Sequence, residues 1–594
     1  MTDSSNTDTA GTSFTPERLR LAGFGALAGL CGWLLTDVLA EELGGTRLHL
    51  FLTVLAGVFF ADALAMAGQM RARAALAGAA LVALPVAGLA ALASLRFETV
   101  EEALRSPQQM LALLLLAALP VPFLIARGIG AGWRDYPALF LAAWNIVVRY
   151  AAAWLFAGVV WAVVYLSDTL LSLVGIEVID WLITEVDLVP WALTGAALGL
   201  GLAVVTELAE LVSPYLVLRL LRLLLPPLLA VMVVFVLALP FRGLSDLFGS
   251  YSAAGTLMAI VMGGVSLISI VVDQNQAEAA RSPLMRNAAR AMALLLPVLA
   301  GLAIWAVLLR INQHGLTPER VAGATAALIV LGYAVLYALS VLLARAAWMD
   351  RIRQANIAMA LAVMALAALW QTPLLNAEAL SARSQLARFQ AGRLTVAQLP
   401  LHEMRWDWGR PGAAALASLG TVTGHAEQAA LEARLAEVAN AVDRYDPGSD
   451  PAGAPALAAL RASLTVLPSG REVPDWVLEG VPQWEADSWQ EACARPDAAG
   501  RPGCVLVVGD LLTSAPGEEA LLFLNGGGDS VIRQGFVSSR GAGYRASAIF
   551  MAPAVEPGAA ALFAALHAGD VRIGPSSAMA LHIGAAEVML QPWP

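Results

Sequence analysis

Lysine is missing from this chain, and all 36 basic residues are arginine. Without lysine there is no Walker A phosphate lysine, no Schiff-base lysine and no Ser–Lys dyad, so ATP hydrolysis by a P-loop of this chain is excluded. The patterns HExxH, CxxC, GxSxG and a GxGxxG after a strand are also missing. We therefore expect no cofactor and no bound metal, and the sequence favours a protein that is not an enzyme.

Cysteine and histidine are scarce as well. The six histidines are scattered, so a zinc site would need the fold to gather them. Cys31 lies in an apolar stretch, where we expect it to pack. Cys493 and Cys504 lie in a polar region, and in an oxidising compartment they are expected to form a disulfide, with two free thiols as the alternative.

Charged residues make up only 14% of the chain and apolar residues 59%, whereas soluble domains have about 25% and about 45–50%. The apolar residues form eleven stretches long enough to cross a hydrocarbon core of about 30 Å. The sequence therefore predicts an α-helical polytopic membrane bundle. The expected spans are 21–40, 48–68, 74–95, 110–126, 143–166, 188–208, 226–240, 254–272, 291–309, 321–344 and 356–374.

The hydropathy breaks near residue 376 and divides the chain into regions. Residues 1–16 are Ser/Thr-rich and predict a disordered cytoplasmic tail, and residues 17–375 form the predicted transmembrane domain. Residues 376–445 predict a helical juxtamembrane segment, and 446–455 a Pro/Gly linker. Residues 456–594 alternate apolar runs with Gly-rich turns, which predicts a β-rich extracytoplasmic part of a soluble α+β domain.

Arginine placement predicts the orientation. Fourteen arginines lie in the connections on one side of the predicted spans and six on the other, and the positive-inside rule places the fourteen in the cytoplasm. The protein is then a bacterial inner-membrane protein with a cytoplasmic N-terminus and a periplasmic C-terminal domain. Residues 376–594 carry a net charge of −8 from 15 Arg and 23 acidic residues. That charge argues against a nucleic-acid partner and leaves the lipid bilayer and a periplasmic or envelope protein as expected partners.

Ionisable groups at membrane depth are costly, so each one raises a functional hypothesis. The candidates are Asp37, Asp62, Asn145, Arg149, Glu207 and Glu210. An ion pair of Arg149 with Asp62 or Glu207 is the most economical arrangement. The functional interpretation is a relay for a proton or a substrate, and the alternatives are a structural ion pair or side chains that reach water.

Three further patterns suggest how parts of the chain meet lipid, water or another helix. Arg219 and Arg222 lie three residues apart in an apolar stretch and are expected to reach lipid phosphates, with a half-buried bundle helix as the alternative. The turn 273–276 is expected to mark a water boundary. The patterns Gly25-x-x-x-Gly29 and Gly195-x-x-x-Gly199 would allow close approach of helices, but this Ala-rich chain produces such matches by chance.

A family resemblance rests on two segments that follow the last span, SARSQLARFQAGRLTVAQL (381–399) and MRWDWGRPGAAALASL (404–419). They resemble the "sQLarl.sG … G..G..aL" segment of the uncharacterised bacterial membrane family known as domain of unknown function 4153. The stretch AAWNIVVRYAAAWLFAGVVWAVVYLSDTLLSLVGI (142–176) is also similar to it, so the resemblance covers most of residues 20–420. Pro411 departs from the pattern, where a bulky residue is expected. The resemblance implies a multi-span protein and no functional residues.

Three function classes stay open. Span number, polar residues within the bundle and missing catalytic patterns favour a transport- or permease-like protein, although no Gly/Pro-interrupted pair of spans repeats in two halves. An envelope assembly or sensing protein whose outer domain binds a partner is the second class. A lipid-linked transferase is the third, and Glu41-Glu42 would be its acidic residues, on a short outer loop.

Overall fold

A computed structural model shows two compact units, Met1–Gln428 (unit 1) and Ala429–Pro594 (unit 2). The structure describes residues 16–207, 214–242, 251–441, 453–479, 481–497, 499–511, 518–527, 530–539, 542–546, 559–569, 571, 580–583 and 586–589. The predicted tail 1–16, apart from Pro16, and residues 446–452 of the predicted linker lie outside them.

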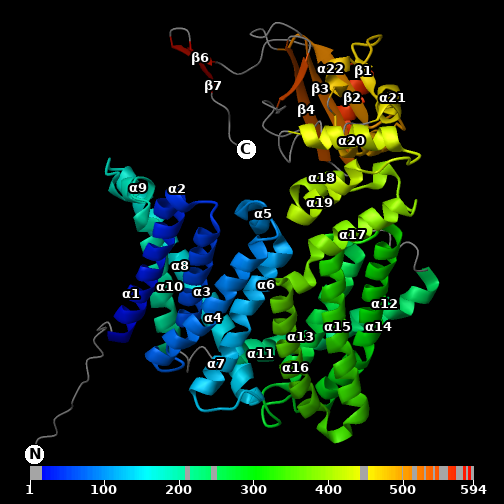
Figure 1. Cartoon of the computed structure of the whole chain (residues 1–594). Coiled ribbons are helices and arrows are strands. Elements are labelled where there is room, and N and C mark those ends of the chain that lie inside the picture. Colours follow the sequence, from blue (N-terminus) through cyan, green and yellow to red (C-terminus); the bar gives the residue numbers. More distant parts are fainter. Residues whose placement is uncertain are drawn as a thin grey trace, which may run out of the picture. The chain divides into compact units, whose positions relative to one another are not determined.

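Unit 1 holds eleven helical stretches that are long and apolar enough to cross a membrane, counted over the described residues (Figure 1). The eleven predicted spans are therefore confirmed as helices. They are α1 (Pro16–Trp33), α3 (Arg47–Met66), α4 (Ala72–Ser94), α6 with α7 (Pro107–Ala118 and Pro120–Gly128), α8 (Tyr136–Ser172), α10 (Leu188–Glu207), α12 (Leu225–Arg242), α13 (Tyr251–Val272), α14 (Pro283–His314), α15 (Pro318–Leu343) and α16 (Trp348–Trp370).

Two of these helices are longer than the hydropathy predicts. Helix α8 has 37 residues because the Asp135 carboxylate accepts a hydrogen bond from the Ala138 amide (3.3 Å) and so caps its start well before the apolar run. Helix α14 has 32 residues and begins with a proline in its first turn. The fourth span is interrupted, since α7 starts afresh at Pro120, whose ring cannot continue a regular helix.

Shorter elements connect the spans or follow them. The first span continues from α1 through η1 (Leu34–Val38) and α2 (Leu39–Leu43). The connections contain α5 (Val100–Leu104), α9 (Val178–Thr184), α11 (Pro214–Arg222) and η2 (Arg345–Ala347). After the last span come η3 (Pro373–Leu375), α17 (Ala377–Gln390), η4 (Val396–Gln398), α18 (Leu401–Trp406) and α19 (Gly409–Gly420). Most of the predicted juxtamembrane segment is thus helical and belongs to unit 1.

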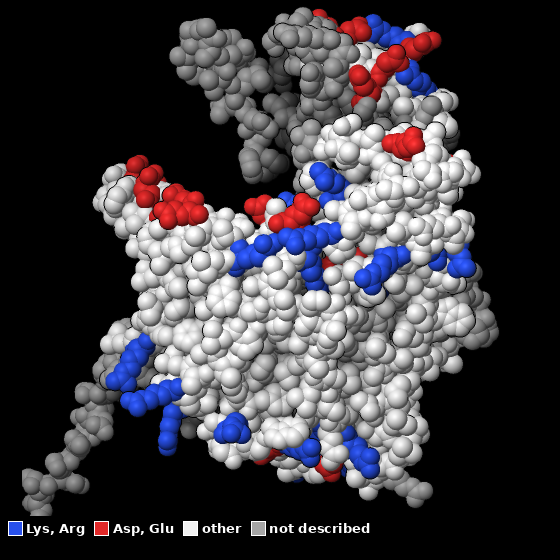
Figure 2. All heavy atoms as spheres, viewed as in Figure 1, with Lys and Arg blue, Asp and Glu red and all other residues white. Residues whose placement is uncertain are grey.

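Charge separates the two ends of unit 1. The end where α3 meets α4, α7 meets α8 and α15 meets α16 is called here the arginine-rich end. Figure 2 shows acidic side chains over α2, α5 and α9 at the opposite end, with arginines beside them, whereas the arginine-rich end shows mainly arginine and few acidic side chains. The wide band between the two ends is almost free of charge, as a hydrocarbon environment requires.

The largest apolar cluster of unit 1 surrounds α14. Ala289, Ala293, Ala300 and Ala303 recur on one face of this helix, and each is fully buried among residues of α13, α15 and α16. Small side chains at this spacing let neighbouring helices approach closely, which is how helices associate where lipid is as apolar as the core. The second half of the bundle therefore packs on α14.

Helices α1 and α10 cross at glycines. Gly25 lies against the backbone of Gly195, and Gly29 lies against the carbonyl of Trp191. A Cβ atom on any of Gly25, Gly29, Gly195 or Gly199 would collide with the backbone of the other helix. The two glycine patterns, which the sequence offers as chance matches, thus face each other and form one helix crossing.

Unit 2 is built on a five-stranded sheet in the order β1-β2-β3-β4-β5, counted over its described residues. Strand β1 (Thr465–Leu467) runs parallel to β2 (Cys504–Gly509), and β3 (Glu519–Gly527), β4 (Ser530–Ser539) and β5 (Ala542–Ala546) continue antiparallel. The other elements are α20 (Gln428–Asn440), α21 (Ala454–Ser463), α22 (Asp475–Leu478), α23 (Gln483–Ala494), α24 (Ala559–Ala568) and a second hairpin of β6 (Ala580–Ile583) and β7 (Ala586–Met589). The predicted α+β domain is confirmed.

Helices cover both faces of the sheet at β2. Leu506 and Val508 pack with Trp489 of α23, while Val505 and Val507 pack with Phe563 of α24. This explains why β2 reads as an unbroken apolar run instead of an alternating one. Residues 454 and 455, which the sequence assigns to the linker, form the first turn of α21, since a proline is well accommodated there.

The glycine crossing gives a direct test of helix packing. Gly25→Leu should lower the free energy of unfolding by about 1–3 kcal/mol, because the new side chain would overpack a backbone contact. Gly23→Leu, on the same helix, should change it little, because no atom lies within 4 Å of the position that a Cβ would take there. Thermal unfolding of the purified full chain measures both, and equal losses would show that the crossing does not limit stability.

Candidate functional site

Asp62 lies four residues before the end of α3 and is only 5% exposed. Residues three and four positions along a helix share a face, and the corresponding Ala65 and Met66 pack in an apolar cluster with Val121 of α7 and Ala142 of α8. The Oδ2 atom of Asp62 is buried and has no hydrogen-bond partner among the described residues. A buried carboxylate oxygen with no partner is costly and therefore marks a candidate site.

Arg149 lies close to this site but does not pair with Asp62. Its guanidinium donates to the carbonyl of Ala67 (2.8 Å) and, more weakly, to that of Ala65 (3.4 Å). The last carbonyls of α3 have no partner within the helix, and a cation at this end satisfies them. The expected ion pair between Arg149 and Asp62 is therefore not formed, because the helix end competes for the same donors.

Neighbouring polar groups on α3 are satisfied in the same way. The Tyr150 hydroxyl donates to the Ala61 carbonyl (2.6 Å), and the Gln69 amide donates to the Ala65 carbonyl (2.9 Å). Helices α8 and α3 are thus joined through α3 backbone carbonyls. The Oδ2 atom of Asp62 and the Nε atom of Arg149 are buried in this region and have no hydrogen-bond partner among the described residues.

The other predicted candidates lie apart from Asp62 or outside what the structure describes. Asp37 is exposed in η1 and accepts a hydrogen bond from the Thr36 hydroxyl (2.7 Å). Asn145 is half-buried on α8, one turn before Arg149. Glu207 is the last residue of α10, with a side chain outside the described part, and Glu210 lies outside the described residues altogether.

A second polar cluster lies at the arginine-rich end, around Asp273. This residue has a left-handed backbone (φ 52°), is fully buried, and forms an ion pair with Arg222 of α11. Arg353 of α16 donates to the Asp273 carbonyl (3.0 Å) and to the Val272 carbonyl (2.6 Å). The expectation that Arg222 reaches lipid phosphates is wrong, because the guanidinium turns inward to a buried carboxylate.

Hydrogen bonds continue from this cluster into the bundle. Asn356 donates to the Tyr136 hydroxyl (2.9 Å) and to the Ser269 hydroxyl (3.2 Å), and the Tyr337 hydroxyl donates to Asn356 Oδ1. These four side chains come from α8, α13, α15 and α16. Because the polar groups bind one another, this network holds the four helices in register.

Sequence reasoning missed the Asp273 cluster for a physical reason. A polar turn after a span usually lies at the boundary with water, and residues 273–276 are expected to do so from the sequence alone. Burial of Asp273 depends on Arg222 and Arg353, which are 51 and 80 residues away in the chain. The only local signal is a polar residue directly after a long apolar helix, and exposed turns give the same signal.

A buried ion pair lies at the opposite end of unit 1. Arg96 Nη1 is 3.5 Å from Glu378 Oε2, and the two side chains are 5% and 2% exposed. The other terminal nitrogen of Arg96 donates to the carbonyls of Trp370 (2.7 Å) and Thr372, at the end of α16. Burial lowers the pKa of Arg96, and the charge of Glu378 opposes that shift.

The segment on which the family resemblance rests docks beside this pair. Ser384 accepts a hydrogen bond from the Leu316 amide (3.2 Å), Gln385 donates to the His314 and Leu316 carbonyls (3.1 and 2.8 Å), and Arg388 donates to the Gln313 carbonyl (2.9 Å). All three side chains therefore bind the connection between α14 and α15. Gly409 packs on the Arg96 carbonyl with a positive φ of 51°, where a Cβ would clash. This segment fixes α17 and α19 to the bundle.

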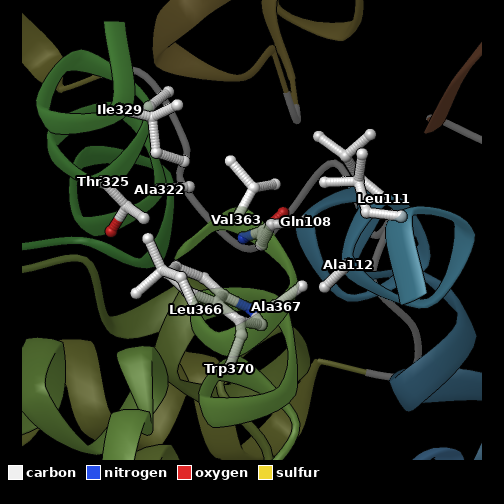
Figure 3. A pocket seen from close by; sticks show the side chains of 12 residues that line it. Gln108, Leu111, Ala112, Ala322, Thr325, Ile329, Val363, Leu366, Ala367 and Trp370 are labelled. Atoms are coloured by element: carbon white, nitrogen blue, oxygen red, sulfur yellow. The ribbon is translucent and has the colours of Figure 1, made fainter. Parts of the chain in front are cut away.

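An apolar cavity of about 100 Å³ lies between α6, α15 and α16. Figure 3 shows Leu111, Ile329, Val363 and Leu366 around it, with Gln108 and Thr325 as its polar members. Its size and lining suit a methyl or acyl group and offer little to a polar substrate.

Unit 2 contains a disulfide and surface ion pairs. Cys493 of α23 is bonded to Cys504 of β2, with Cα atoms 4.7 Å apart. The Arg501 guanidinium hydrogen-bonds Asp497 and holds the pKa of that carboxyl at about 2. Across the described parts of both units, no group of three or more His, Cys, Asp or Glu side chains is placed to hold a metal ion.

Comparison of the chain with protein-family models, with curated proteins and with solved structures finds no match. The resemblance to the uncharacterised membrane family stays a prediction.

The Arg96–Glu378 pair gives a second test. Glu378→Ala should lower the free energy of unfolding by about 3–5 kcal/mol, because it leaves the Arg96 charge buried without its partner. Exposed Glu98, two residues from Arg96, provides the matched control Glu98→Ala, which should change stability little. Thermal unfolding reports stability, and trypsin cleavage after the exposed Arg383 reports release of α17. Identical behaviour of the two variants would contradict a role for the pair.

Proposed function

We propose that this membrane protein is permease-like and moves a proton or a small cation, with Asp62 as the residue that binds it. One observation carries the proposal: the carboxylate oxygen of Asp62 is buried within a spanning helix and has no partner among the described residues. A proton or a cation would supply the missing partner.

The surroundings of Asp62 support this assignment. Arg149, the cation that the sequence offers as its partner, is occupied by the carbonyls at the end of α3, so it does not neutralise the carboxylate. Asp62 is only 5% exposed, and Met66, four residues further along the same helix, packs with Val121. A structural ion pair, the alternative interpretation of the sequence, therefore lacks its cation.

A sensing or envelope-assembly role is the second candidate. The bonds of Ser384, Gln385 and Arg388 to the α14–α15 connection support it, because they tie the segment after the last span to the bundle. A rigid attachment of this kind would transmit a change in the bundle to the segment that leads to unit 2. A lipid-linked transferase finds no comparable support, since Glu41 and Glu42 lie in the five-residue helix α2.

We also propose a bacterial inner membrane, with the arginine-rich end of unit 1 in the cytoplasm and unit 2 in the periplasm. The connections between the spans hold fourteen arginines on one side and six on the other, which supports the direction. The Cys493–Cys504 disulfide supports an oxidising compartment for unit 2. The outer partner would then be a periplasmic or envelope protein.

Proton flux tests the assignment of Asp62. The full chain is reconstituted into vesicles that contain a pH-sensitive dye, and a potassium diffusion potential drives protons inward. The wild type should acidify the lumen faster than protein-free vesicles, and Asp62→Asn should return the rate to the protein-free level, since the amide is nearly isosteric but cannot take up a proton.

Asp180→Asn is the matched control, because Asp180 is exposed on the short helix α9. It should retain the wild-type flux at equal protein content. Wild-type vesicles that acidify no faster than empty ones would exclude the proton as the transported ion. An Asp62→Asn variant that conducts normally would overturn the assignment of Asp62.

Thiol labelling tests the orientation in a Cys31→Ser background. In spheroplasts, a membrane-impermeant maleimide should label Cys493 and Cys504 only after an impermeant reductant has been added. A cysteine introduced by Arg134→Cys, in the connection before α8, should be labelled only after lysis. Labelling of the native pair before reduction would contradict the disulfide, and labelling only after lysis would reverse the orientation.

A further inference from the structure

A cavity of about 670 Å³ opens at the arginine-rich end, between the start of α1, the end of α3 and the start of α4. Its lining combines two kinds of side chain. Arg20, Gln69 and Arg71 are polar, whereas Leu21, Phe24 and Leu76 are apolar. A site of this size with a cationic part and an apolar part suits an amphiphile.

Positive charge at this cavity is not neutralised by the described part of the chain. Arg20 and Arg71 are both exposed, and neither forms a hydrogen bond or an ion pair with a described residue. The buried arginines differ in this respect, since Arg149 and Arg353 both donate hydrogen bonds to backbone carbonyls. Two guanidinium groups are thus free to bind an anion, and each provides the paired donors that phosphate prefers.

The backbone adds to the same potential. Helix α4 starts at Ala72, directly after Arg71, and no side chain caps its first turn. The first amides of a helix have no internal partner and carry the positive end of the helix dipole. The competing carbonyls at the end of α3 are already bound by Arg149 and Gln69. An anion at this point therefore meets donors, and the Ala65 and Ala67 carbonyls do not compete for them.

The apolar wall indicates which kind of anion fits. Phe24 and Leu76 line the cavity together with the arginines, and Leu76 of the spanning helix α4 is also 41% exposed. A soluble phosphate would leave this wall in water, whereas an acyl chain would cover it and continue into the bilayer. Basic pockets of this kind at the ends of spanning helices recognise lipid head groups.

We propose that this cavity binds an anionic phospholipid, with the phosphate between Arg20 and Arg71 at the start of α4 and one acyl chain along Phe24 and Leu76. The site is separate from Asp62 and does not depend on the proposed transport. An anionic phospholipid bound in this cavity would contact α1, α3 and α4 together and would be a structural partner of these three helices.

Native mass spectrometry of the detergent-purified full chain tests the proposal, with phosphatidylglycerol, phosphatidylcholine or inorganic phosphate added in turn. Phosphatidylglycerol should bind the wild type more tightly than phosphatidylcholine. Arg20→Gln/Arg71→Gln should weaken that binding by about 30-fold, since each basic residue near lipid phosphate contributes about 1 kcal/mol.

Arg73→Gln/Arg127→Gln is the control, because it removes the same charge from exposed positions at the same end of unit 1. It should leave phosphatidylglycerol affinity within about twofold of the wild type, well inside the tenfold that 1.4 kcal/mol represents. A similar loss in both double variants would reduce the effect to general charge attraction and overturn the site. Inorganic phosphate that displaces phosphatidylglycerol at equal concentration would make it a soluble-anion site, which also contradicts the proposal.

Discussion

Hydrocarbon offers no water to a polar group, so each backbone carbonyl at the end of a buried helix must find a donor within the protein. Arginine supplies that donor at three helix ends in unit 1. Arg149 binds the last carbonyls of α3, Arg353 those of α13, and Arg96 those of α16. One guanidinium satisfies two carbonyls at each end, which a lysine ammonium does less well because it lacks the planar fork. In this chain, which has no lysine, arginine side chains therefore satisfy the terminal carbonyls of these helices. The arrangement of the bundle depends on these hydrogen bonds.

Against this background, Asp62 stands out by its burial. Asp273 binds Arg222, Glu378 binds Arg96, and Asp37 is exposed. Asp168 of α8 also has a carboxylate oxygen with no partner among the described residues, but its side chain is only half-buried, whereas Asp62 is 5% exposed. A buried carboxylate oxygen without a partner lowers stability, so packing alone gives no reason to keep one. Packing provides no role for the Asp62 carboxylate, whereas binding of a proton or a cation does. Asp62 therefore favours transport over a purely structural role.

The architecture was predictable because hydropathy acts locally. Each span needs only its own apolar residues, and the eleven predicted stretches all fold as helices, although α8 and α14 extend well beyond the predicted bounds. Polar pairing was not predictable, because it depends on which helices become neighbours. Asp62 and Arg149 are at a suitable depth to pair, yet the carbonyl of Ala67 takes the guanidinium. The same limit applies to Gly25 and Gly195. Each glycine pattern alone is common in this chain, and only the packing of α1 against α10 shows that the two patterns form a helix crossing.

The turn between α3 and α4 links the two proposed sites. Ala63 lines the lipid cavity, and Asp62 is its neighbour in the chain, about 100° around the helix from it. A lipid in the cavity would therefore press on the same helical turn as the candidate ion site without touching the carboxylate. Arg149 holds the end of that turn to α8 through Ala65 and Ala67. A movement of α3 that exposes Asp62 to water must either break the hydrogen bonds from Arg149 or move Arg149 and α8 with it. Both the bound lipid and Arg149 would therefore influence the movement of α3 that transport requires.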